Sequence, residues 1–386
     1  MVSRAKRGVI ASWWWTVDKP MLGLVTILMV LGLVFSLVAS PVMAARYDYA
    51  DFHFVVRHAA FLLVAFTGMV VVSMLPARRA RQLAFLTLVG ALILMVVTLF
   101  VGPSTKGASR WIEIGSYKLQ PSEFLKPAFV TVSAWLFAES LTRHDMPGRL
   151  LAMGLCAVSA GLLILQPDVG QTVLLIGVWA ALFFMAGLHW FWVATLSGAS
   201  VAGLGLLYLV LPHVSGRIDR FLTGAGDTYQ VDRAHDAIVR GGWFGQGPGE
   251  GIVKQRLPDS HTDFIFAAMT EEFGIVVAVL LVTLFAAIVW RGLSHAVREN
   301  EPFLRFTVTG LTLLFAFQAI INVGVNVQLL PAKGMTLPFV SYGGSSLVAS
   351  AFTMGLLLAF TRKRAANYAR ATLRPVSIAG AAHAQA

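Results

Sequence analysis

Residues 21–38 read MLGLVTILMVLGLVFSLV, an unbroken apolar run without a charged side chain. As a helix this run would be roughly 27 Å long, close to the roughly 30 Å hydrocarbon thickness of a bilayer. A basic stretch with Arg4, Lys6 and Arg7 precedes it, and residues 41–44 (PVMA) resemble a signal-peptide cleavage site. The run is longer than the roughly 7–15 apolar residues of a signal peptide. We therefore predict that it is retained as a membrane-spanning helix.

Nine more apolar runs of spanning length follow the first. The chain is 57% hydrophobic and 13% charged, whereas soluble domains carry about 25% charged residues. Because a bilayer core offers no water to the backbone, an apolar run that crosses it must be helical. We predict an all-α integral membrane protein with about ten transmembrane helices at residues 21–43, 57–76, 83–102, 123–140, 149–166, 169–187, 190–212, 263–291, 303–328 and 338–361.

The distribution of charge predicts the orientation. If the N-terminus is cytoplasmic, the cytoplasmic segments hold 17 of the 30 Lys and Arg residues but only five of the 19 acids. This excess follows the positive-inside rule, and an even helix count puts both termini in the cytoplasm. We attribute the net charge of +11 to this orientation and expect no nucleic-acid partner. The predicted organisation is a cytoplasmic segment at 1–20, a membrane domain at 21–361 and a basic, disordered cytoplasmic tail at 362–386.

One predicted extracytoplasmic loop, residues 213–262 between the seventh and eighth helices, is far longer than the rest. It mixes aromatic, charged and glycine residues and is not of low complexity. Long loops are usually either functional or disordered. We expect this one to be ordered and functional.

A first polar cluster follows the third predicted helix and consists of Arg110, Trp111, Gln120, Glu123 and Lys126. Glu123 and Lys126 share one face of the fourth helix and can pair, while Ser122 can cap that helix. One interpretation is an interfacial loop anchored by Trp111 with a structural Glu–Lys pair. The other is a cation, Arg110, beside an aromatic platform that meets an anionic amphiphile.

A second polar position is Asp168, between the fifth and sixth predicted helices. An acid so close to the bilayer is usually paired or functional. A role as the N-cap of the sixth helix is the simpler interpretation.

The third cluster ends the long loop with Lys254, Arg256, His261 and Asp263. Asp263 precedes apolar residues and stands where water meets lipid, a setting that suits a general base. The alternative is an N-cap role, for which Ser260 and Thr262 compete. Glu271 and Glu272 lie about two turns further along, and acids embedded in a membrane are rarely idle.

The fourth cluster comprises Asn322, Asn326, Lys333, Ser341 and Tyr342, followed by GGSS at 343–346. Small residues at this density permit close helix packing, which is the alternative to a functional role. The segment is not a phosphate-binding Walker A loop, because no Gly-Lys-Ser/Thr follows at the required spacing.

Five stretches carry a resemblance to a known family: GASRWIEIG with QPSE (107–123), QPDVGQT (166–172), YQVDRAHDAIVRGGWFGQGPGEG (229–251), LPDSHTDFIFAAMTEEFG (257–274) and PAKGMTLPFVSYGGSS (331–346). In this order they resemble the SEDS family, the RodA/FtsW peptidoglycan glycosyltransferases, over residues 20–364. The KGMTLP form at 333–338 is more similar to the FtsW branch than to the RodA branch. Asp259 and Glu250 depart from the family's commoner residues.

The resemblance implies an enzyme of the bacterial inner membrane that polymerises glycan strands from lipid II, the undecaprenyl-pyrophosphate-linked disaccharide pentapeptide. It implies membrane-lipid contacts, a class B penicillin-binding protein as the cross-linking partner, other divisome proteins and a place at the division septum. Asp263 matches the family's essential loop aspartate, and Lys333 and Arg110 match positions tied to function.

The expected chemistry fits these residues. A carboxylate such as Asp263 can accept the proton of the attacking sugar 4-hydroxyl. Arg110, Lys254, Arg256 and Lys333 are the candidate cations for the pyrophosphate leaving group. A divalent cation, Mg²⁺ or Mn²⁺, could share that work, although the sequence names no metal ligands.

A lipid II flippase is the main rival, and a non-enzymatic septal scaffold is a third hypothesis. A flippase needs polar groups through the whole membrane depth and gates at both faces. The four clusters instead lie on the predicted outer side, which favours the glycosyltransferase.

Overall fold

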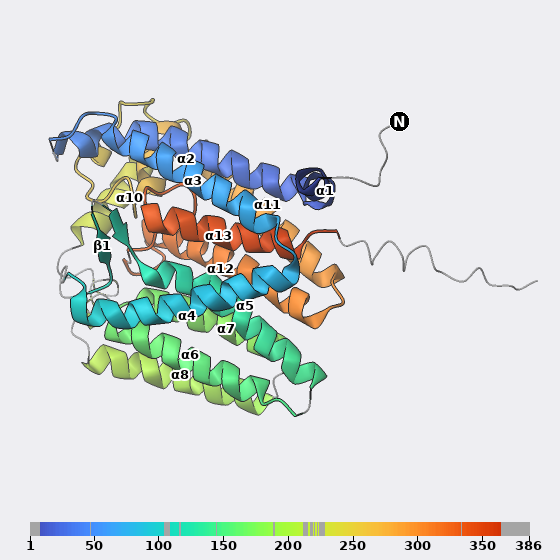
Figure 1. Ribbon diagram of the computed structural model, residues 1–386. Coiled ribbons are helices and arrows are strands. Elements are labelled where there is room, and N and C mark those ends of the chain that lie inside the picture. Colours follow the sequence, from blue (N-terminus) through green and yellow to red (C-terminus); the bar gives the residue numbers. More distant parts are fainter. Residues whose placement is uncertain are drawn as a thin grey trace, which may run out of the picture.

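The protein is seen in a computed structural model that describes residues 8–46, 48–103, 109–115, 117–143, 145–187, 190–210, 215–216, 219, 221, 223, 228–332 and 334–363. It is a bundle of long helices that run side by side (Figure 1). The helices are α1 (Val9–Thr16), α2 (Lys19–Arg46), α3 (His53–Ser73), α4 (Ala77–Val101), α5 (Pro121–Thr142), α6 (Gly148–Leu165), α7 (Val169–Met185), α8 (Trp190–Val210), α10 (Tyr229–Gly241), α11 (Ile265–Arg298), α12 (Pro302–Asn326) and α13 (Gly344–Phe360).

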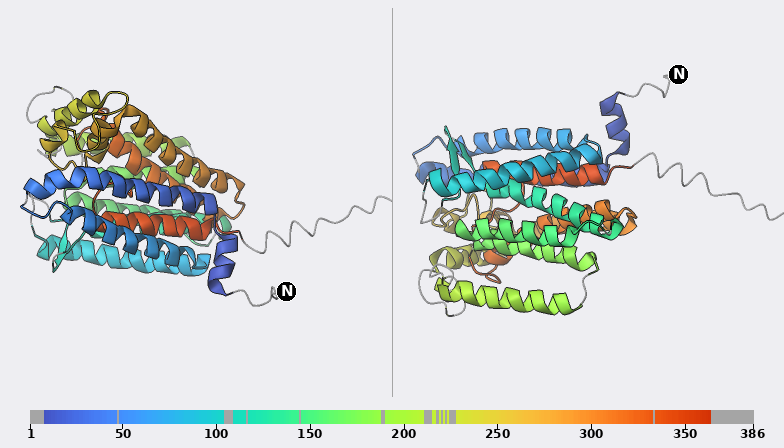
Figure 2. Two further views of the ribbon diagram at one scale, coloured as in Figure 1. Left: turned by 90° about the horizontal axis from the view of Figure 1, so that it is seen from above. Right: turned by 60° about the horizontal axis from the view of Figure 1, so that its bottom comes forward.

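Three short elements and one transverse helix complete the fold. Strands β1 (Ile112–Ile114) and β2 (Tyr117–Leu119) form an antiparallel hairpin, and η1 (Val253–Gln255) is a single 3-10 turn. The end of the bundle that carries this hairpin and residues 228–263 is called the hairpin end. Helix α1 lies across the opposite end, which is called the basic end (Figures 1 and 2).

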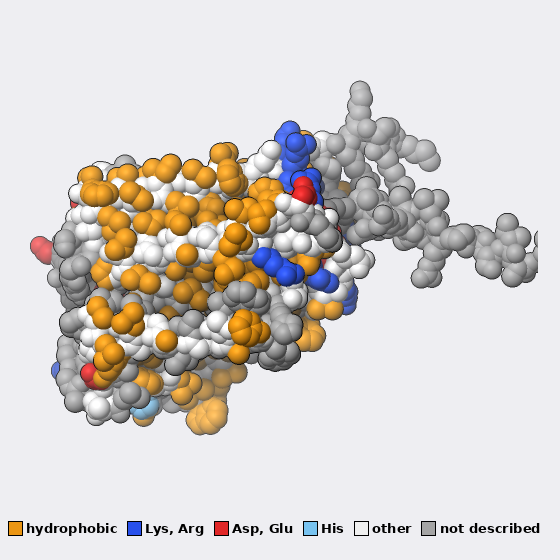
Figure 3. Space-filling model, turned by 90° about the horizontal axis from the view of Figure 1, so that it is seen from below, with side chains coloured by type: hydrophobic (Ala, Val, Ile, Leu, Met, Phe, Trp, Pro, Cys, Tyr) orange, Lys and Arg blue, Asp and Glu red, His pale blue; other side chains and the backbone are white. Residues whose placement is uncertain are grey.

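The bundle buries some helices fully and others on one face. Helix α13 is buried along nearly its whole length and packs against α3, α12 and α5. Helix α4 buries only a stripe, which includes Ala84, Leu88 and Met95, and exposes Leu86, Ile93 and Phe100. Apolar side chains therefore cover the middle of the face seen in Figure 3, as expected for a protein whose solvent is lipid.

The helical, apolar architecture confirms the predicted class. Within the described residues, six helices are long and apolar enough to cross a membrane, namely α2, α3, α4, α6, α11 and α12. Helices α7 and α13 are also apolar but have 17 residues each. The count of ten spans and the orientation of the termini stay predictions.

Several boundaries differ from those predicted. The last helix begins at Gly344 rather than at residue 338, because Phe339 has a positive φ of 64° and interrupts the helical backbone. Residues 1–20 contain α1, and the long loop contains α10. Residues 228–262 of that loop are tied by backbone hydrogen bonds to the start of α11.

Helix α11 is broken at Gly274, whose φ of 79° and ψ of 175° are non-helical. Residues 242–247 fill the break. The N–H groups of Ile275 and Val276 donate to the carbonyls of Gly242 and Trp243 at 2.9 and 3.2 Å, and Gln246 donates to the carbonyl of Glu271 at 2.9 Å. The loop thus satisfies backbone groups that an interrupted helix would leave unpaired.

Replacing Gly274 by alanine should destabilise the protein. A Cβ at this position would lie 2.3 Å from the Trp243 carbonyl oxygen, in a backbone region that costs other residues about 1–3 kcal/mol from strain alone. Gly154→Ala is the matched control, because its Cβ would meet nothing within 4 Å. Thermal unfolding in detergent should show a lower Tm for Gly274→Ala only. An equal Tm for both variants would contradict the role of the break.

Candidate functional site

The four clusters predicted from the sequence meet at the hairpin end and are joined by hydrogen bonds. Arg110 lies at one side of this network. Its Nε donates to the carbonyl of Gln166 at 2.8 Å, its Nη2 donates to the carbonyl of Pro167, and its Nη1 lies 3.5 Å from Oδ2 of Asp168. The side chain is 26% exposed, so the guanidinium is both anchored and accessible.

Asp168 serves two purposes. It is the N-cap of α7, where its Oδ1 accepts from the Gln171 backbone N–H at 3.3 Å, and it faces Arg110. The predicted N-cap role is therefore confirmed. The same carboxylate connects Arg110 to the helix that carries Gln171.

Gln171 connects this N-cap to the buried pair on α5 by hydrogen bonds. Its Nε2 donates to Oε1 of Glu123 at 2.8 Å, and Lys126 Nζ donates to Oε2 of Glu123 at 2.8 Å. Lys126 also donates to Oε1 of Gln318 at 3.3 Å. The two charged side chains are 6% and 3% exposed, so each must be neutralised by the other. The predicted pairing at i and i+3 is confirmed.

The predicted cap of α5 is wrong in detail. Gln120 rather than Ser122 is the N-cap residue, with Pro121 at the first helical position. Gln120 Nε2 donates to the Ser122 hydroxyl at 3.1 Å. Trp111, which precedes β1, is half-buried.

Three amides on one face of α12 form a ladder beside the loop that ends at α13. Gln318 Nε2 donates to the Thr336 carbonyl at 3.3 Å, and Asn322 Nδ2 donates to the Met335 carbonyl at 2.6 Å. Gln318, Asn322 and Asn326 are spaced by four residues, which places them on one helix face. Neither Gln171 nor Gln318 was identified from the sequence. For Gln318, its spacing of four residues from Asn322, and of eight from Asn326, in an apolar helix was a usable signal.

The ladder ends at Asp263. Asn322 Nδ2 and Asn326 Nδ2 donate to the Asp263 carbonyl at 2.9 and 3.1 Å, and Asn326 Oδ1 accepts from the Ala267 N–H at 3.1 Å. The N-cap residue of α11 is Phe264, with no side-chain cap, so the N-cap alternative for Asp263 is wrong. A Cβ on Gly334 would lie 3.2 Å from Asp263 Oδ2. The half-buried carboxylate thus lies against the chain next to residue 333.

Ser341 and Tyr342 join the fourth cluster to the third. Ser341 Oγ donates to the Thr262 carbonyl at 2.6 Å and accepts from the Leu337 N–H at 2.7 Å. The Tyr342 N–H donates to the His261 carbonyl at 2.9 Å. These bonds hold the two residues that precede Asp263 against the loop before α13. Lys333 itself lies outside the residues that the structure describes.

His261 is buried in an aromatic cluster. Its ring centroid lies 5.2 Å from that of Phe54 and 5.5 Å from that of Tyr342. Burial lowers the pKa of His261 to about 4, and the carboxylate of Asp259 opposes this shift only in part. The imidazole is therefore neutral at physiological pH.

Lys254 and Arg256 have different surroundings. Lys254 is buried in an ion pair with Glu272, and its Nζ also donates to the Val38 carbonyl at 3.2 Å. The oxygens of Glu271 accept from the backbone N–H groups of Val253 and Lys254, both at 2.7 Å. These two acids fix the end of the long loop. Arg256 is exposed.

The donor set for a divalent cation is weak. Among the described residues, no group of three or more His, Cys, Asp or Glu side chains is arranged to hold a metal ion. Glu271 and Glu272, which follow Asp263 on α11, already accept hydrogen bonds from the loop. No catalytic step is therefore assigned to a metal here.

Comparison with known proteins agrees with this arrangement. A family model described as "Cell cycle protein", which covers FtsW, RodA and SpoVE, matches residues 19–366. "Probable peptidoglycan glycosyltransferase FtsW" of Caulobacter vibrioides is 43% identical over 368 residues, which are 95% of this chain and 94% of that protein. The protein of the same name from Legionella pneumophila is 35% identical over 353 residues, which are 88% of this chain and 90% of that protein.

Solved structures show the same fold. A chain from a structure described as "Structural coordination of polymerization and crosslinking by a peptidoglycan synthase complex" aligns with a TM-score of 0.75 and 26% identity, over 89% of this chain and 97% of that one. The rod shape-determining protein RodA of Thermus thermophilus aligns with a TM-score of 0.67 and 26% identity, over 90% and 97% of the two chains. The chain belongs to the FtsW/RodA/SpoVE family, and the resemblance inferred from its motifs is confirmed.

Removing one partner of the buried pair should be more harmful than removing both. Lys126→Met leaves Glu123 buried with its charge uncompensated, which costs about 3–5 kcal/mol. The double variant Glu123→Leu/Lys126→Met has no charge to compensate and should recover much of that loss. Thermal unfolding of Lys126→Met, Glu123→Leu and the double variant gives the coupling free energy between the two side chains. Additive losses would show that the two side chains do not depend on each other.

Stability should fall as pH falls from 6.5 to about 4. The unfolded chain protonates His261 near 6.5, whereas the folded protein resists protonation down to about 4. The stabilisation is thus complete above 6.5, and its loss is bounded at about 3 kcal/mol. His261→Asn should flatten the dependence of Tm on pH, while His235→Asn, an exposed position on α10, should not. Identical slopes in wild type and His261→Asn would contradict this.

Proposed function

We propose that this chain is a peptidoglycan glycosyltransferase that polymerises lipid II into glycan strands at the division septum. It would work in the bacterial inner membrane, with ten spans, both termini in the cytoplasm and the hairpin end outside. The names of its relatives support the activity, and the convergence of the four clusters at one end supports the location. The polyprenyl tail of the substrate would lie among the apolar helices.

The observation that carries the mechanism is the way Asp263 is held. Two amides of α12 fix its backbone carbonyl, and its carboxylate lies beside Gly334, where a Cβ would be 3.2 Å from Oδ2. In the proposed reaction, this carboxylate accepts the proton of the sugar 4-hydroxyl. The hydroxyl oxygen then bonds to the anomeric carbon of the lipid-linked chain, and the bond to the lipid pyrophosphate breaks.

The leaving pyrophosphate needs positive charge. We assign this role to Arg110 and Lys333, with the exposed Arg256 as a further contact at the mouth of the site. Arg110 is suited to it because two backbone carbonyls fix its guanidinium while part of it stays exposed. Lys254 is already paired with Glu272, so we assign it to holding the loop.

The remaining predicted site residues would position these groups. Glu123 and Lys126 brace α5 against α7 and α12 through Gln171 and Gln318, and Ser341 and Tyr342 clamp the segment that contains His261. Trp111 and Gln120 flank the hairpin beside Arg110. A substrate contact for any of these residues belongs to the proposal.

A class B penicillin-binding protein is the proposed partner, with other divisome proteins around it. The solved peptidoglycan synthase complex coordinates polymerisation with cross-linking, as its description states, and one of its chains shares this fold. By analogy, a cross-linking enzyme would receive the strands made at the hairpin end.

Asp263→Asn should abolish polymerisation of purified lipid II in liposomes. Loss of a general base typically costs 10²- to 10⁴-fold in rate, so we expect a fall of at least about 100-fold. Asp259→Asn is the matched control, because Asp259 lies in the same loop with a positive φ of 54° that asparagine tolerates. The assay is run with and without the class B penicillin-binding protein.

Two results would contradict the proposal. Full polymerisation by a normally folded Asp263→Asn variant would remove the general-base assignment. Transport of lipid II across the liposome membrane, without polymer from the wild type under any condition, would favour the flippase.

A further inference from the structure

The basic end contains a cavity of about 620 Å³. It is open to the surface and is lined by the end of α1, the α3–α4 turn, the starts of α4 and α12, and the residues around the end of α13. Four cations and one carboxylate line it, namely Arg78, Arg81, Arg362, Lys363 and Glu301. The lining is therefore positively charged, on the side of the molecule opposite to Asp263.

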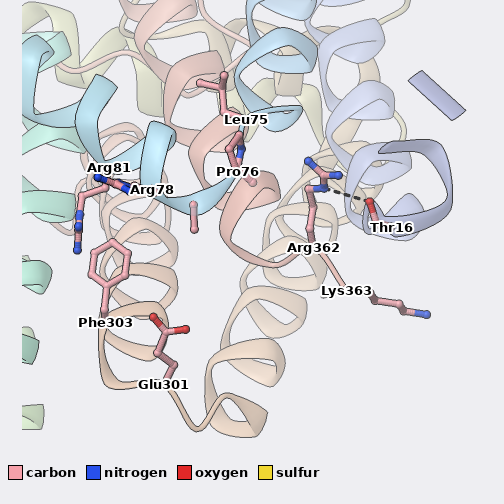
Figure 4. A pocket seen from close by; sticks show the side chains of 11 residues that line it. Thr16, Leu75, Pro76, Arg78, Arg81, Glu301, Phe303, Arg362 and Lys363 are labelled. Carbon is pink, nitrogen blue, oxygen red and sulfur yellow. Dashed lines mark hydrogen bonds between the residues drawn. The ribbon is translucent and has the colours of Figure 1, made fainter. Parts of the chain in front are cut away.

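Two arginines of this cavity, Arg362 and Arg81, are held in place by the surrounding structure. Arg362 Nε donates to the Thr16 hydroxyl at 3.0 Å, and its Nη1 donates to the Met74 carbonyl at 2.9 Å. The Arg81 guanidinium lies 4.9 Å from the ring centroid of Trp135 and 5.5 Å from that of Phe303. Arg78 and Arg81 are on one side of the cavity and Arg362 on the other (Figure 4). Burial lowers the pKa of Arg362, and a bound anion would offset that cost.

Helix α1 places the cavity at the depth of lipid headgroups. Trp13 Nε1 donates to the Ser73 hydroxyl at 2.9 Å and pins α1 to α3, while Trp14 and Trp15 are exposed beneath Lys19, whose Nζ lies 4.9 and 4.8 Å from their ring centroids. Exposed tryptophans next to a cation are typical of the membrane–water interface. A helix that lies across the bundle end with such side chains marks the interfacial plane.

Apolar surface continues from the cavity along the bundle. Leu75 lines the cavity, and Val71, which lies one turn earlier on α3, is exposed. In the same way, Arg81 lines the cavity, and Phe85, which lies one turn later on α4, is exposed. The wall thus changes from cationic to apolar in the direction of the bilayer. Free phosphate would use only the first part of this surface, whereas a phospholipid would use both.

We propose that this cavity binds the phosphate headgroup of an anionic phospholipid, whose acyl chains lie along the exposed faces of α3 and α4. Basic pockets between membrane helices bind such headgroups in other proteins. The bound lipid would join the ends of α1, α4 and α12 to the residues after α13. This site does not depend on the proposed glycosyltransferase reaction.

The test is native mass spectrometry of the full-length, detergent-purified protein titrated with palmitoyl-oleoyl phosphatidylglycerol. Phosphatidylcholine with the same acyl chains is the zwitterionic comparison, and glycerol 3-phosphate is the soluble one. We expect one retained phosphatidylglycerol. Arg78→Gln should weaken its retention about fivefold, as expected for one cation near a headgroup.

Two variants control for general effects of charge and folding. Arg79→Gln removes a neighbouring exposed cation that does not line the cavity, so retention should stay within about twofold of wild type. Glu301→Gln removes the one carboxylate of the lining and should strengthen retention. The proposal is overturned if phosphatidylcholine is retained equally, if Arg78→Gln and Arg79→Gln lose equally, or if glycerol 3-phosphate competes as well as the lipid.

Discussion

A charge inside an apolar helix bundle must be paired, and the hairpin end is organised around one such pair. Glu123 and Lys126 are buried on α5, and each makes one further hydrogen bond, Glu123 with Gln171 of α7 and Lys126 with Gln318 of α12. Because an unmatched charge there would be very costly, the three helices are fixed relative to one another. Arg110 and Asp168 lie on one side of this junction, and the amide ladder that leads to Asp263 lies on the other.

The same constraint separates cations that can meet a substrate from cations that cannot. Lys254 and Lys126 are buried with carboxylate partners, so their charge acts on the protein itself. Arg110 is anchored but partly exposed, and Arg256 is exposed. A positively charged residue in a motif therefore says little about substrate binding until its partner in the protein is known. The partner of Lys254, Glu272, lies 18 residues away in the sequence.

The sequence predicted what depends on local pattern. Apolar runs indicated the helices, the spacing of Glu123 and Lys126 indicated their pairing, and Asp168 before an apolar run indicated an N-cap. It missed what depends on contacts between distant segments. The break at Gly274 is stabilised by residues 242–247, and the segment before α13 is bonded through Ser341 and Tyr342 to residues 261–262. The glutamines of α7 and α12 matter because one bonds to Glu123 and the other to Lys126.

The break in α11 also determines how much of this helix lies within the apolar layer of the membrane. The helix has 34 residues, about 51 Å at 1.5 Å per residue, which exceeds the roughly 30 Å of bilayer hydrocarbon by about 20 Å. Such a hydrophobic mismatch in a straight rod would require strong tilt or a thickened bilayer. Dividing the helix at Gly274 lets residues 275–290 cross the apolar layer, while the preceding turns, residues 265–272, are buried within the hairpin end. In the proposed orientation, Asp263 would then lie level with the sugar and pyrophosphate of the proposed substrate rather than with its polyprenyl tail.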